Sequence, residues 1–258
     1  MPITWDYYFQ FTVNKLYGIS TFSDPFELFM LIVFLIAFIF LLGIINALYK
    51  DYKKNKIIET FLFLLGMILL IPSNIFLILI SLCYSTFGLP ELGAFLTLIA
   101  LFPSQITYLC VNIFAIRVTF PKRYKVVLVI LLILSAATVG AQAWAIIVGS
   151  PYSRLINFSM VYSFEVQIIR YIGLVPIAVI PISVFYYYAI KVREENKARS
   201  SRSIWLGTGI LFFALAVLIA SVAGEFRIFQ VLYLPAAIIF YVCFSMPDWF
   251  KRRIGWTE

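Results

Sequence analysis

Residues 26–49 read FELFMLIVFLIAFIFLLGIINALY, and the chain continues at 50–56 with KDYKKNK. The apolar run exceeds the roughly 20 residues that an α-helix, rising about 1.5 Å per residue, needs to cross the hydrocarbon of a membrane. Four lysines follow within seven residues, and lysine and arginine collect on the cytoplasmic side of membrane helices. This stretch therefore predicts a transmembrane helix whose carboxyl end faces the cytoplasm.

The same pattern recurs along the 258 residues. The further apolar stretches lie at 57–83, 92–116, 126–148, 166–190, 203–222 and 228–246. Transmembrane strands are excluded, because these runs are continuous rather than alternating and far exceed the roughly ten residues of a barrel strand. Hydrophobic residues make up 63% of the chain and charged residues 12%, which leaves no room for a soluble domain. We expect an all-α, polytopic membrane protein.

The predicted seven-helix bundle occupies 26–246 and has an amphipathic segment on either side. Residues 1–25 are rich in aromatic side chains but too polar to span, so we expect an interfacial segment on the outer surface. In the tail, 247–258, Phe250 and Ile254 lie four residues apart among basic residues. This spacing predicts an amphipathic helix whose basic side contacts the cytoplasmic leaflet.

The distribution of positive charge predicts the orientation of the bundle. Of the 20 Lys and Arg residues, 16 fall in the gaps after the first, third, fifth and seventh stretches. Because basic residues in short loops stay on the cytoplasmic side, we expect the N-terminus outside and the C-terminus in the cytoplasm, in the cell membrane. The net charge of +8 then reflects attraction to anionic lipids rather than to nucleic acid.

Several kinds of chemistry are excluded by missing residues. The chain has no histidine, three dispersed cysteines and no glycine-rich phosphate loop, so nucleophile–histidine pairs and histidine or thiolate metal sites are excluded. A pair of carboxylates remains formally possible, but the spans hold almost no acid, so this chemistry is disfavoured. No span contains a lysine, which excludes a retinal Schiff base. We expect a protein without enzymatic activity, metal or cofactor.

Polar residues inside or at the ends of the spans are the candidate functional positions, because a polar side chain in hydrocarbon is costly and tends to face the bundle interior. The candidate ligand-binding residues are Gln142, Glu165, Arg170, Glu225, Arg227 and Gln230 toward the outside, with Asn74 and Gln105 at mid-depth. Glu165, Glu225 or an anionic ligand could neutralise Arg170. We interpret the outer group as an outward-facing pocket covered by the 149–164 loop. A structural ion pair, or an arginine that reaches the outer headgroups, would explain the same residues.

Glu59 and Arg117 lie near the predicted inner ends of the second and third spans. An ion pair between them would lock the cytoplasmic ends of these helices together. The alternative is that Arg117 is one more basic anchor at the membrane boundary. Asn157 begins a glycosylation sequon in the longest predicted outer loop, a short motif that does not by itself show glycosylation.

Small residues at helical spacing predict where helices approach closely. The fourth span carries Ala137, Ala141 and Ala145 at intervals of four, with Gly140 beside them. Small side chains allow close backbone approach in lipid, so we expect a helix–helix contact along this ladder.

The chain resembles G-protein-coupled receptors in topology but not in their defining residues. Ile116 stands before Arg117 where those receptors have an acid, and Leu234 stands before Pro235 where they have asparagine. The chain is also similar to the seven-helix N-terminal sensor region of prokaryotic histidine kinases. The last helix there leads into a Pro-aromatic-basic segment like Pro247-Asp248-Trp249-Phe250-Lys251-Arg252-Arg253.

This resemblance implies a receptor or sensor. Because no kinase follows the tail, we expect a signal to pass to a cytoplasmic partner that contacts 191–202 and the tail. The partners we expect are the lipid bilayer, a small-molecule ligand, that signalling partner and a second copy of the chain. The alternatives are a small-solute transporter or channel of the seven-span type, and an accessory membrane protein.

Overall fold

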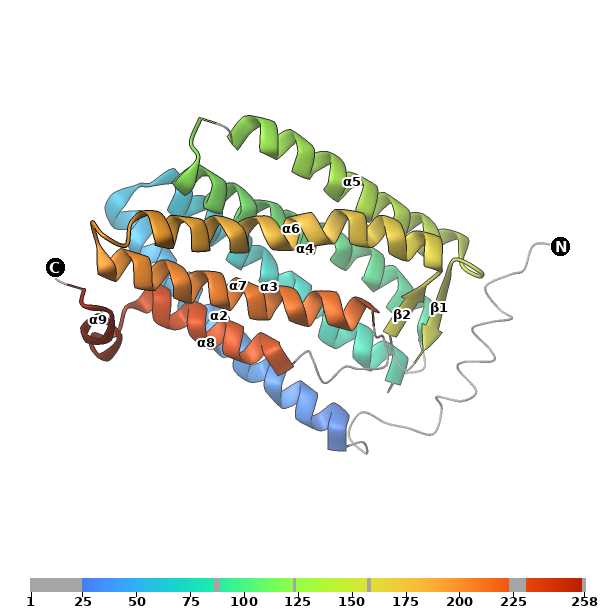
Figure 1. Ribbon diagram of the computed structural model, residues 1–258. Coiled ribbons are helices and arrows are strands. Elements are labelled where there is room, and N and C mark those ends of the chain that lie inside the picture. The colour runs from blue at the N-terminus through green and yellow to red at the C-terminus, as the bar shows by residue number, and fades with distance from the viewer. Residues whose placement is uncertain (1–24, 86–88, 123, 157–158, 223–230, 257–258) are drawn as a thin grey trace.

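The computed structural model describes residues 25–85, 89–122, 124–156, 159–222 and 231–256. Over these residues the chain forms long helices and one short hairpin (Figure 1). The helices are α2 (Pro25–Asn55), α3 (Ile58–Ser85), α4 (Pro90–Thr119), α5 (Tyr124–Val148), α6 (Phe164–Lys191), α7 (Lys197–Val222), α8 (Tyr233–Ser245) and α9 (Asp248–Ile254). The strands are β1 (Ser153–Ile156) and β2 (Ser159–Tyr162).

Helices α2 to α8 overlap the seven apolar stretches in turn, and several extend into the charged segments. Helix α2 continues through the lysine-rich segment to Asn55, and α7 already begins at Lys197. Lysine and arginine are good helix formers, so nothing in these segments forces the helix to stop. Lys53 and Lys54 in the last turn of α2 also interact favourably with the negative end of the helix dipole.

Six of the described helices, α2 to α7, are long and apolar enough to cross a membrane. Helix α8 has 13 residues and meets the same criterion only together with α9, from which it is bent by 86°. The bend follows Met246, whose φ is 48°, and Pro247, which has no N–H to continue the α8 ladder. The helical bundle therefore fits an integral membrane protein with six, or up to seven, spanning helices.

The helices pack as a ring with one helix outside it. Around the ring, α2 packs against α3, α3 against α4, α4 against α6, α6 against α7, α7 against α8, and α8 against α2. Helix α5 lies outside this ring, against α4 and α6, along the upper edge of the bundle in Figure 1. The ring encloses the largest cluster of buried apolar side chains, which includes Phe63, Phe185 and Phe240.

The 149–164 segment departs from the all-α expectation. Strands β1 and β2 pair antiparallel, with Ser153 opposite Tyr162 and Ile156 opposite Ser159. The side chain of Ser153 donates a hydrogen bond of 2.8 Å to the carbonyl of Ala145, which ties the hairpin to the end of α5. Strands of four residues are too short for an alternating pattern to show in the sequence.

The contact between α5 and α6 follows the predicted ladder of small residues only in part. Ala145 is fully buried in a cluster with Val166 of α6, and Ala141 packs against this cluster. Gly140 has nothing within 4 Å of its Cβ position, and Ala137 is exposed. Between these positions Thr138 packs directly on Gly173 of α6, where a Cβ would overlap the Thr138 hydroxyl and lie 3.1 Å from the Leu134 carbonyl.

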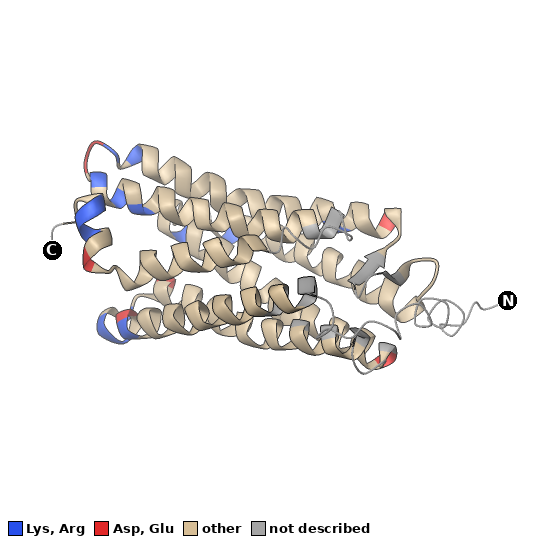
Figure 2. Ribbon diagram, turned by 90° about the horizontal axis from the view of Figure 1, so that it is seen from below, with Lys and Arg blue, Asp and Glu red and all other residues tan. Residues whose placement is uncertain are grey.

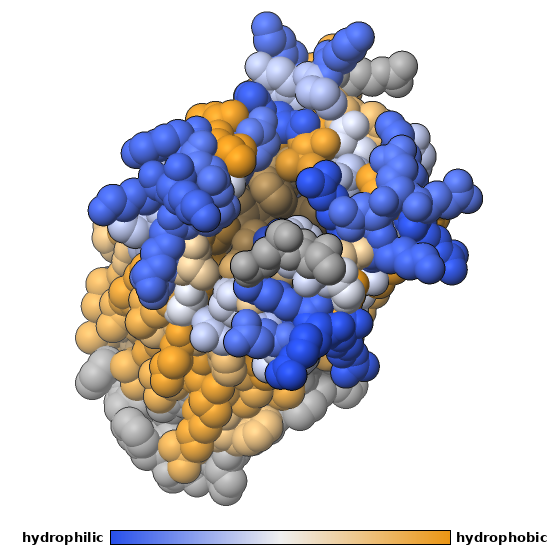
Figure 3. All heavy atoms as spheres, turned by 90° about the vertical axis from the view of Figure 1, so that its left-hand side faces the viewer, coloured by the Kyte–Doolittle hydropathy of each residue, from blue (hydrophilic) through white to orange (hydrophobic). Residues whose placement is uncertain are grey.

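The two ends of the bundle differ in charge. Among the described side chains, Lys and Arg gather at the end that carries α9, which we call the basic end (Figure 2). The opposite end carries β1 and β2, and we call it the hairpin end. Figure 3 looks onto the basic end, where hydrophilic side chains surround a central hollow.

Helix α9 lies against the basic end. Phe250 and Ile254 are buried, and Phe250 contacts the ring of Trp205 on α7 at a centroid distance of 5.8 Å. Arg252 and Arg253 on the same short helix are exposed. The helix thus has one apolar face against the bundle and a basic face turned away from it.

Candidate functional site

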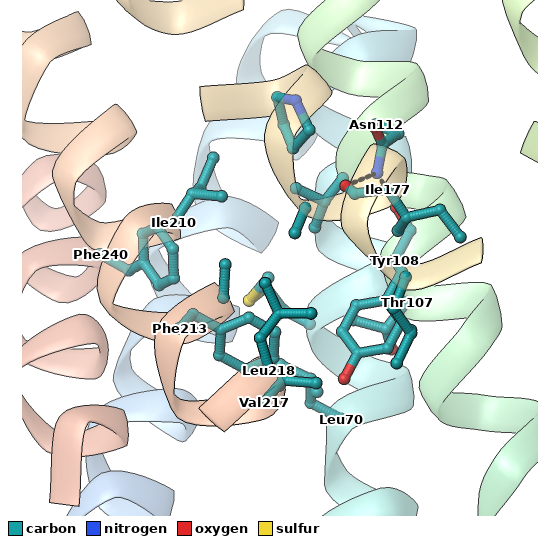
Figure 4. Close-up of a pocket in the computed structure, with 16 residues that line it drawn as sticks. Leu70, Thr107, Tyr108, Asn112, Ile177, Ile210, Phe213, Val217, Leu218 and Phe240 are labelled. Atoms are coloured by element: carbon teal, nitrogen blue, oxygen red, sulfur yellow. Dashed lines mark hydrogen bonds between the residues drawn. The ribbon is translucent and has the colours of Figure 1, made fainter. Parts of the chain in front are cut away.

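Two neighbouring cavities lie inside the ring of helices. The first, of about 50 Å³, is enclosed by α3, α4, α6, α7 and α8, and we call it the α6 cavity (Figure 4). The second, of about 90 Å³, is enclosed by α2, α3, α4, α7 and α8, and we call it the α2 cavity. The side chains that line both cavities are Met67, Leu70, Tyr108, Phe213 and Phe240. Tyr108 and Phe213 thus belong to the walls of both cavities.

The α6 cavity is almost entirely apolar. Its polar residue Asn112 is buried, and its amide donates hydrogen bonds to the carbonyls of Tyr108 at 2.9 Å and Ile177 at 2.8 Å (Figure 4). The Ile177 carbonyl lacks its helical partner, because residue 181, four positions later, is a proline. Asn112 thus satisfies a backbone group that Pro181 frees. The Asn112 Oδ1 atom itself has no hydrogen-bond partner.

The α2 cavity carries more polar groups, including the predicted mid-depth residue Asn74. The Asn74 amide donates to the Leu70 carbonyl at 2.8 Å, and the hydroxyls of Ser104 and Ser73 are 3.2 Å apart across α4 and α3. Three aromatic contacts also line this space: Tyr108 with Phe213 at 5.9 Å, Phe213 with Tyr233 at 5.4 Å, and Tyr233 with Phe34 at 5.9 Å.

Arg170 of α6 lies at the hairpin side of these cavities. Leu174, one turn further along α6, lines the α6 cavity. The charge of Arg170 interacts with the phenol groups of Tyr108 and Tyr233, which line the α2 cavity. The guanidinium also lies over the ring of Tyr162 in β2, 5.5 Å from its centroid. Burial raises the pKa of Tyr162, and the positive charge of Arg170 acts in the opposite direction.

Arg170 has no acidic partner among the described residues. Its Nε atom is buried and has no hydrogen-bond partner. Glu165, one of the partners suggested for it, is exposed near the start of α6 and makes no ion pair with it. Of the suggested partners, Glu165 is therefore excluded, because it remains in contact with solvent at the end of its helix.

The other predicted pocket residues are distributed differently. Gln142 is buried, but it lies on α5 outside the ring, and its amide donates to the Thr138 carbonyl at 3.1 Å. Gln105 is buried on α4, lines neither cavity, and has no partner for its Oε1 atom. The candidates Glu225, Arg227 and Gln230, the sequon residue Asn157 and most of the 1–25 segment lie outside the described residues.

The proposed pair of Glu59 and Arg117 is present in the structure. The Arg117 Nε atom donates to Glu59 Oε1 at 2.9 Å, joining α3 to α4 at the basic end. The Arg117 guanidinium also lies over the ring of Tyr124, 4.8 Å from its centroid, at the start of α5. This group therefore holds three helices together and lies away from the two cavities.

Sequence reasoning missed the aromatic residues that form the cavity walls. Tyr108 and Phe213 were not candidates, although they separate the two cavities. One signal was present: Tyr108 stands in the middle of its apolar stretch, whereas membrane tyrosines concentrate at the interfaces. A tyrosine at that depth needs an internal partner for its hydroxyl.

Comparison with protein-family models, with curated proteins and with solved structures found no match to this chain. The resemblance to seven-helix sensor regions thus gains no support beyond topology and the segment at 247–253. Any function must be inferred from the geometry of the bundle.

Proposed function

We propose that the protein is a non-enzymatic, seven-span membrane receptor or sensor that binds a small molecule within the ring of helices. The observation that supports this most directly is Arg170, whose buried Nε atom has no hydrogen-bond partner among the described residues and whose charge acts on Tyr108 and Tyr233 in the wall of the α2 cavity. A half-buried charge without an acidic partner is costly in a membrane helix and is expected at functional positions. Arg170 and the cavity walls come from several helices, so a bound molecule would change how these helices pack.

The proposed orientation places the hairpin end outside and the basic end in the cytoplasm. The gathering of Lys and Arg at the basic end supports it (Figure 2). In this proposal α8 and the apolar residues before it form the seventh span, and α9 lies along the cytoplasmic surface, since it is turned 86° from α8.

This topology is testable by cysteine labelling in intact cells. The three native cysteines are buried in the bundle, so we expect them not to react with the labelling reagent. We expect a cysteine at Tyr152, next to the hairpin, to react with a membrane-impermeant maleimide. A cysteine at Lys54 in α2 should react only after the cells are opened. The reverse pattern would refute the orientation.

A path from the cavities to the cytoplasmic surface supports the sensing part of the proposal. Phe213 and Ile210 of α7 line the α6 cavity, and the same helix carries Arg202 and Trp205 at the basic end. Arg202 donates to the Cys243 carbonyl at 3.0 Å and lies over the Trp256 ring at 5.7 Å. A shift of α7 caused by a ligand would therefore move α9 and the tail, where we propose that a signalling partner binds.

The test of the proposed function is a ligand screen on purified protein with and without the cavity. Replacing Ala237, a lining residue of the α2 cavity, with leucine should fill that space. We expect at least one molecule from a screen, or one that copurifies, to raise the Tm of the wild-type protein and not of the Ala237→Leu variant. If no molecule makes this distinction, the receptor proposal fails.

The second candidate is a small-solute transporter, which is favoured by the hollow at the centre of the basic end (Figure 3). A transporter needs a route from a central cavity to each surface, and this hollow would supply one of them. Flux of the bound molecule into proteoliposomes would support the transporter. Saturable binding without flux would support the sensor. Ala237→Leu should abolish either activity.

A further inference from the structure

We propose that the ligand of this site is a monocarboxylate with a small apolar body. The carboxylate would bind the Arg170 guanidinium, and the apolar body would occupy the neighbouring cavities. This inference rests on the proposed function and specifies the chemistry of its ligand.

The charge requirement comes from Arg170. Of the described side chains, it is the one basic group in the half of the bundle that ends in the hairpin, and it has no acidic partner there. Tyrosine hydroxyls and the face of Tyr162 reduce the cost of its burial but cannot neutralise it. An anion that reaches this position would gain a charge-assisted hydrogen bond to a donor, Nε, that has no acceptor among the described residues.

One guanidinium favours a single negative charge. A planar carboxylate accepts two parallel N–H bonds from a guanidinium, whereas a phosphate ester with two charges would need a second cation close by. The described side chains near Arg170 are instead tyrosines, which are Tyr108, Tyr162, Tyr171 and Tyr233. Phenol hydroxyls can donate further hydrogen bonds to a carboxylate without adding charge.

The shape and polarity of the cavities specify the rest of the molecule. The walls of the α6 cavity are aliphatic and aromatic except for Thr107 and Asn112. The Thr107 hydroxyl lies 3.0 Å from the Gly66 carbonyl and 2.9 Å from the Pro103 carbonyl, so it is already engaged by the protein. The ligand body must therefore be apolar where it meets these walls.

The cavity volumes limit the size of that body. At about 50 and 90 Å³, each cavity is smaller than the engineered cavity of about 150 Å³ that binds benzene. A flexible alkyl chain can pass from one cavity to the other when Tyr108 or Phe213 rotates, whereas a rigid polycyclic body cannot. The structure thus favours a straight-chain carboxylate, which could come from water as a short acid or from the bilayer as a fatty acid.

The experiment measures binding of hexanoate, octanoate and oleate to the purified full-length protein, with hexanol and octanol as uncharged controls. The wild-type protein should bind a carboxylate saturably and its alcohol at least about tenfold more weakly. Arg170→Gln should remove this preference, whereas Arg193→Gln, at an exposed arginine of the basic end, should keep it. Preference for octanoate would identify a soluble acid and preference for oleate a membrane lipid, and either supports the carboxylate.

A second variant keeps the test decisive where Arg170→Gln does not fold. Ala237→Leu leaves Arg170 in place and should lose carboxylate binding by filling the α2 cavity. Equal binding of octanol and octanoate to the wild type, or unchanged carboxylate binding by a folded Arg170→Gln variant, would overturn the inference. If a neutral or cationic molecule binds and is lost in Ala237→Leu, the carboxylate inference fails and the receptor proposal stands. If no molecule binds, both fail.

Discussion

At the basic end, Arg117 and Arg202 each donate to an acceptor of the protein, the Glu59 carboxylate at 2.9 Å and the Cys243 carbonyl at 3.0 Å. Toward the hairpin end, the buried Nε atom of Arg170 has no partner among the described residues. The same bundle therefore contains two arginines that join helices and one arginine whose Nε atom has no partner among the described residues. The role of a charged residue in a membrane helix can be inferred only when its partner is known.

The largest expected change in stability comes from a substitution that tests how tightly the helices pack near the hairpin end. Gly173→Leu should destabilise the protein by about 3 kcal/mol or prevent folding, because a side chain there meets Thr138 and the Leu134 carbonyl. The measurement is thermal unfolding in detergent micelles, followed by circular dichroism. Tight packing at Gly173 would show that the nearby cavities are a specific feature of the ring.

Gly140→Leu is the matched control, on the partner helix α5. Its Cβ position has no neighbour within 4 Å, so the change in stability should stay within about 0.5 kcal/mol. Similar losses for the two variants would mean that α5 does not pack on α6 as described.

The next largest change in stability is expected at Arg202, which donates a hydrogen bond to a backbone carbonyl. Arg202→Met should lower the free energy of unfolding by about 2 kcal/mol, because the Cys243 carbonyl at the end of α8 would lose its charged donor. The contact with the Trp256 ring would be lost as well, so α9 should become accessible to trypsin. Arg199→Met, at an exposed position on the same helix, should leave both properties unchanged.

Arg170→Met should act in the opposite direction from Arg202→Met. Removing a half-buried charge that has no acidic partner among the described residues relieves a desolvation cost, so the ligand-free variant should be more stable than the wild type by roughly 1 kcal/mol. The measurement is the Tm without ligand and with octanoate, which should raise only the wild-type value. A clear loss of stability without ligand would show that Arg170 has a structural partner outside the described residues.

The positions of the six long apolar helices could be predicted from the sequence, but the contacts between them could not. An apolar run long enough to cross a bilayer, ended by lysines, predicted α2 within a few residues at its start. The interior face of such a helix is harder to predict, because lipid and protein core are equally apolar and leave no periodic pattern. This is why the contact was expected along Ala137, Ala141 and Ala145, whereas Thr138, which packs on Gly173, was not a candidate.

The candidate site was predictable only where a charge marked it. Arg170 was identified because arginine is rare at depth, and the structure places it one helical turn before Leu174, which lines the α6 cavity. Its surroundings were harder to predict, because Phe213 is as apolar as its neighbours along α7, and the one signal, Tyr108 at mid-depth in α4, does not show which side chains it meets. Glu165 was one of the partners suggested for it, yet a position at the start of α6 leaves this side chain exposed.

The smallest expected effect concerns the paired arginine. Glu59→Gln should lower stability by less than about 1 kcal/mol, because the side chains of Arg117 and Glu59 remain 28% and 24% exposed and solvent screens their attraction. Glutamine can also still accept the Arg117 hydrogen bond. The difference between the wild type and the variant should shrink further in high salt, which a Tm series at rising NaCl would measure. A loss of several kcal/mol that does not depend on salt would mean that the Glu59–Arg117 pair behaves as a buried ion pair. Arg117 and Arg170 would then differ in whether they have an acidic partner, and not in their exposure to solvent.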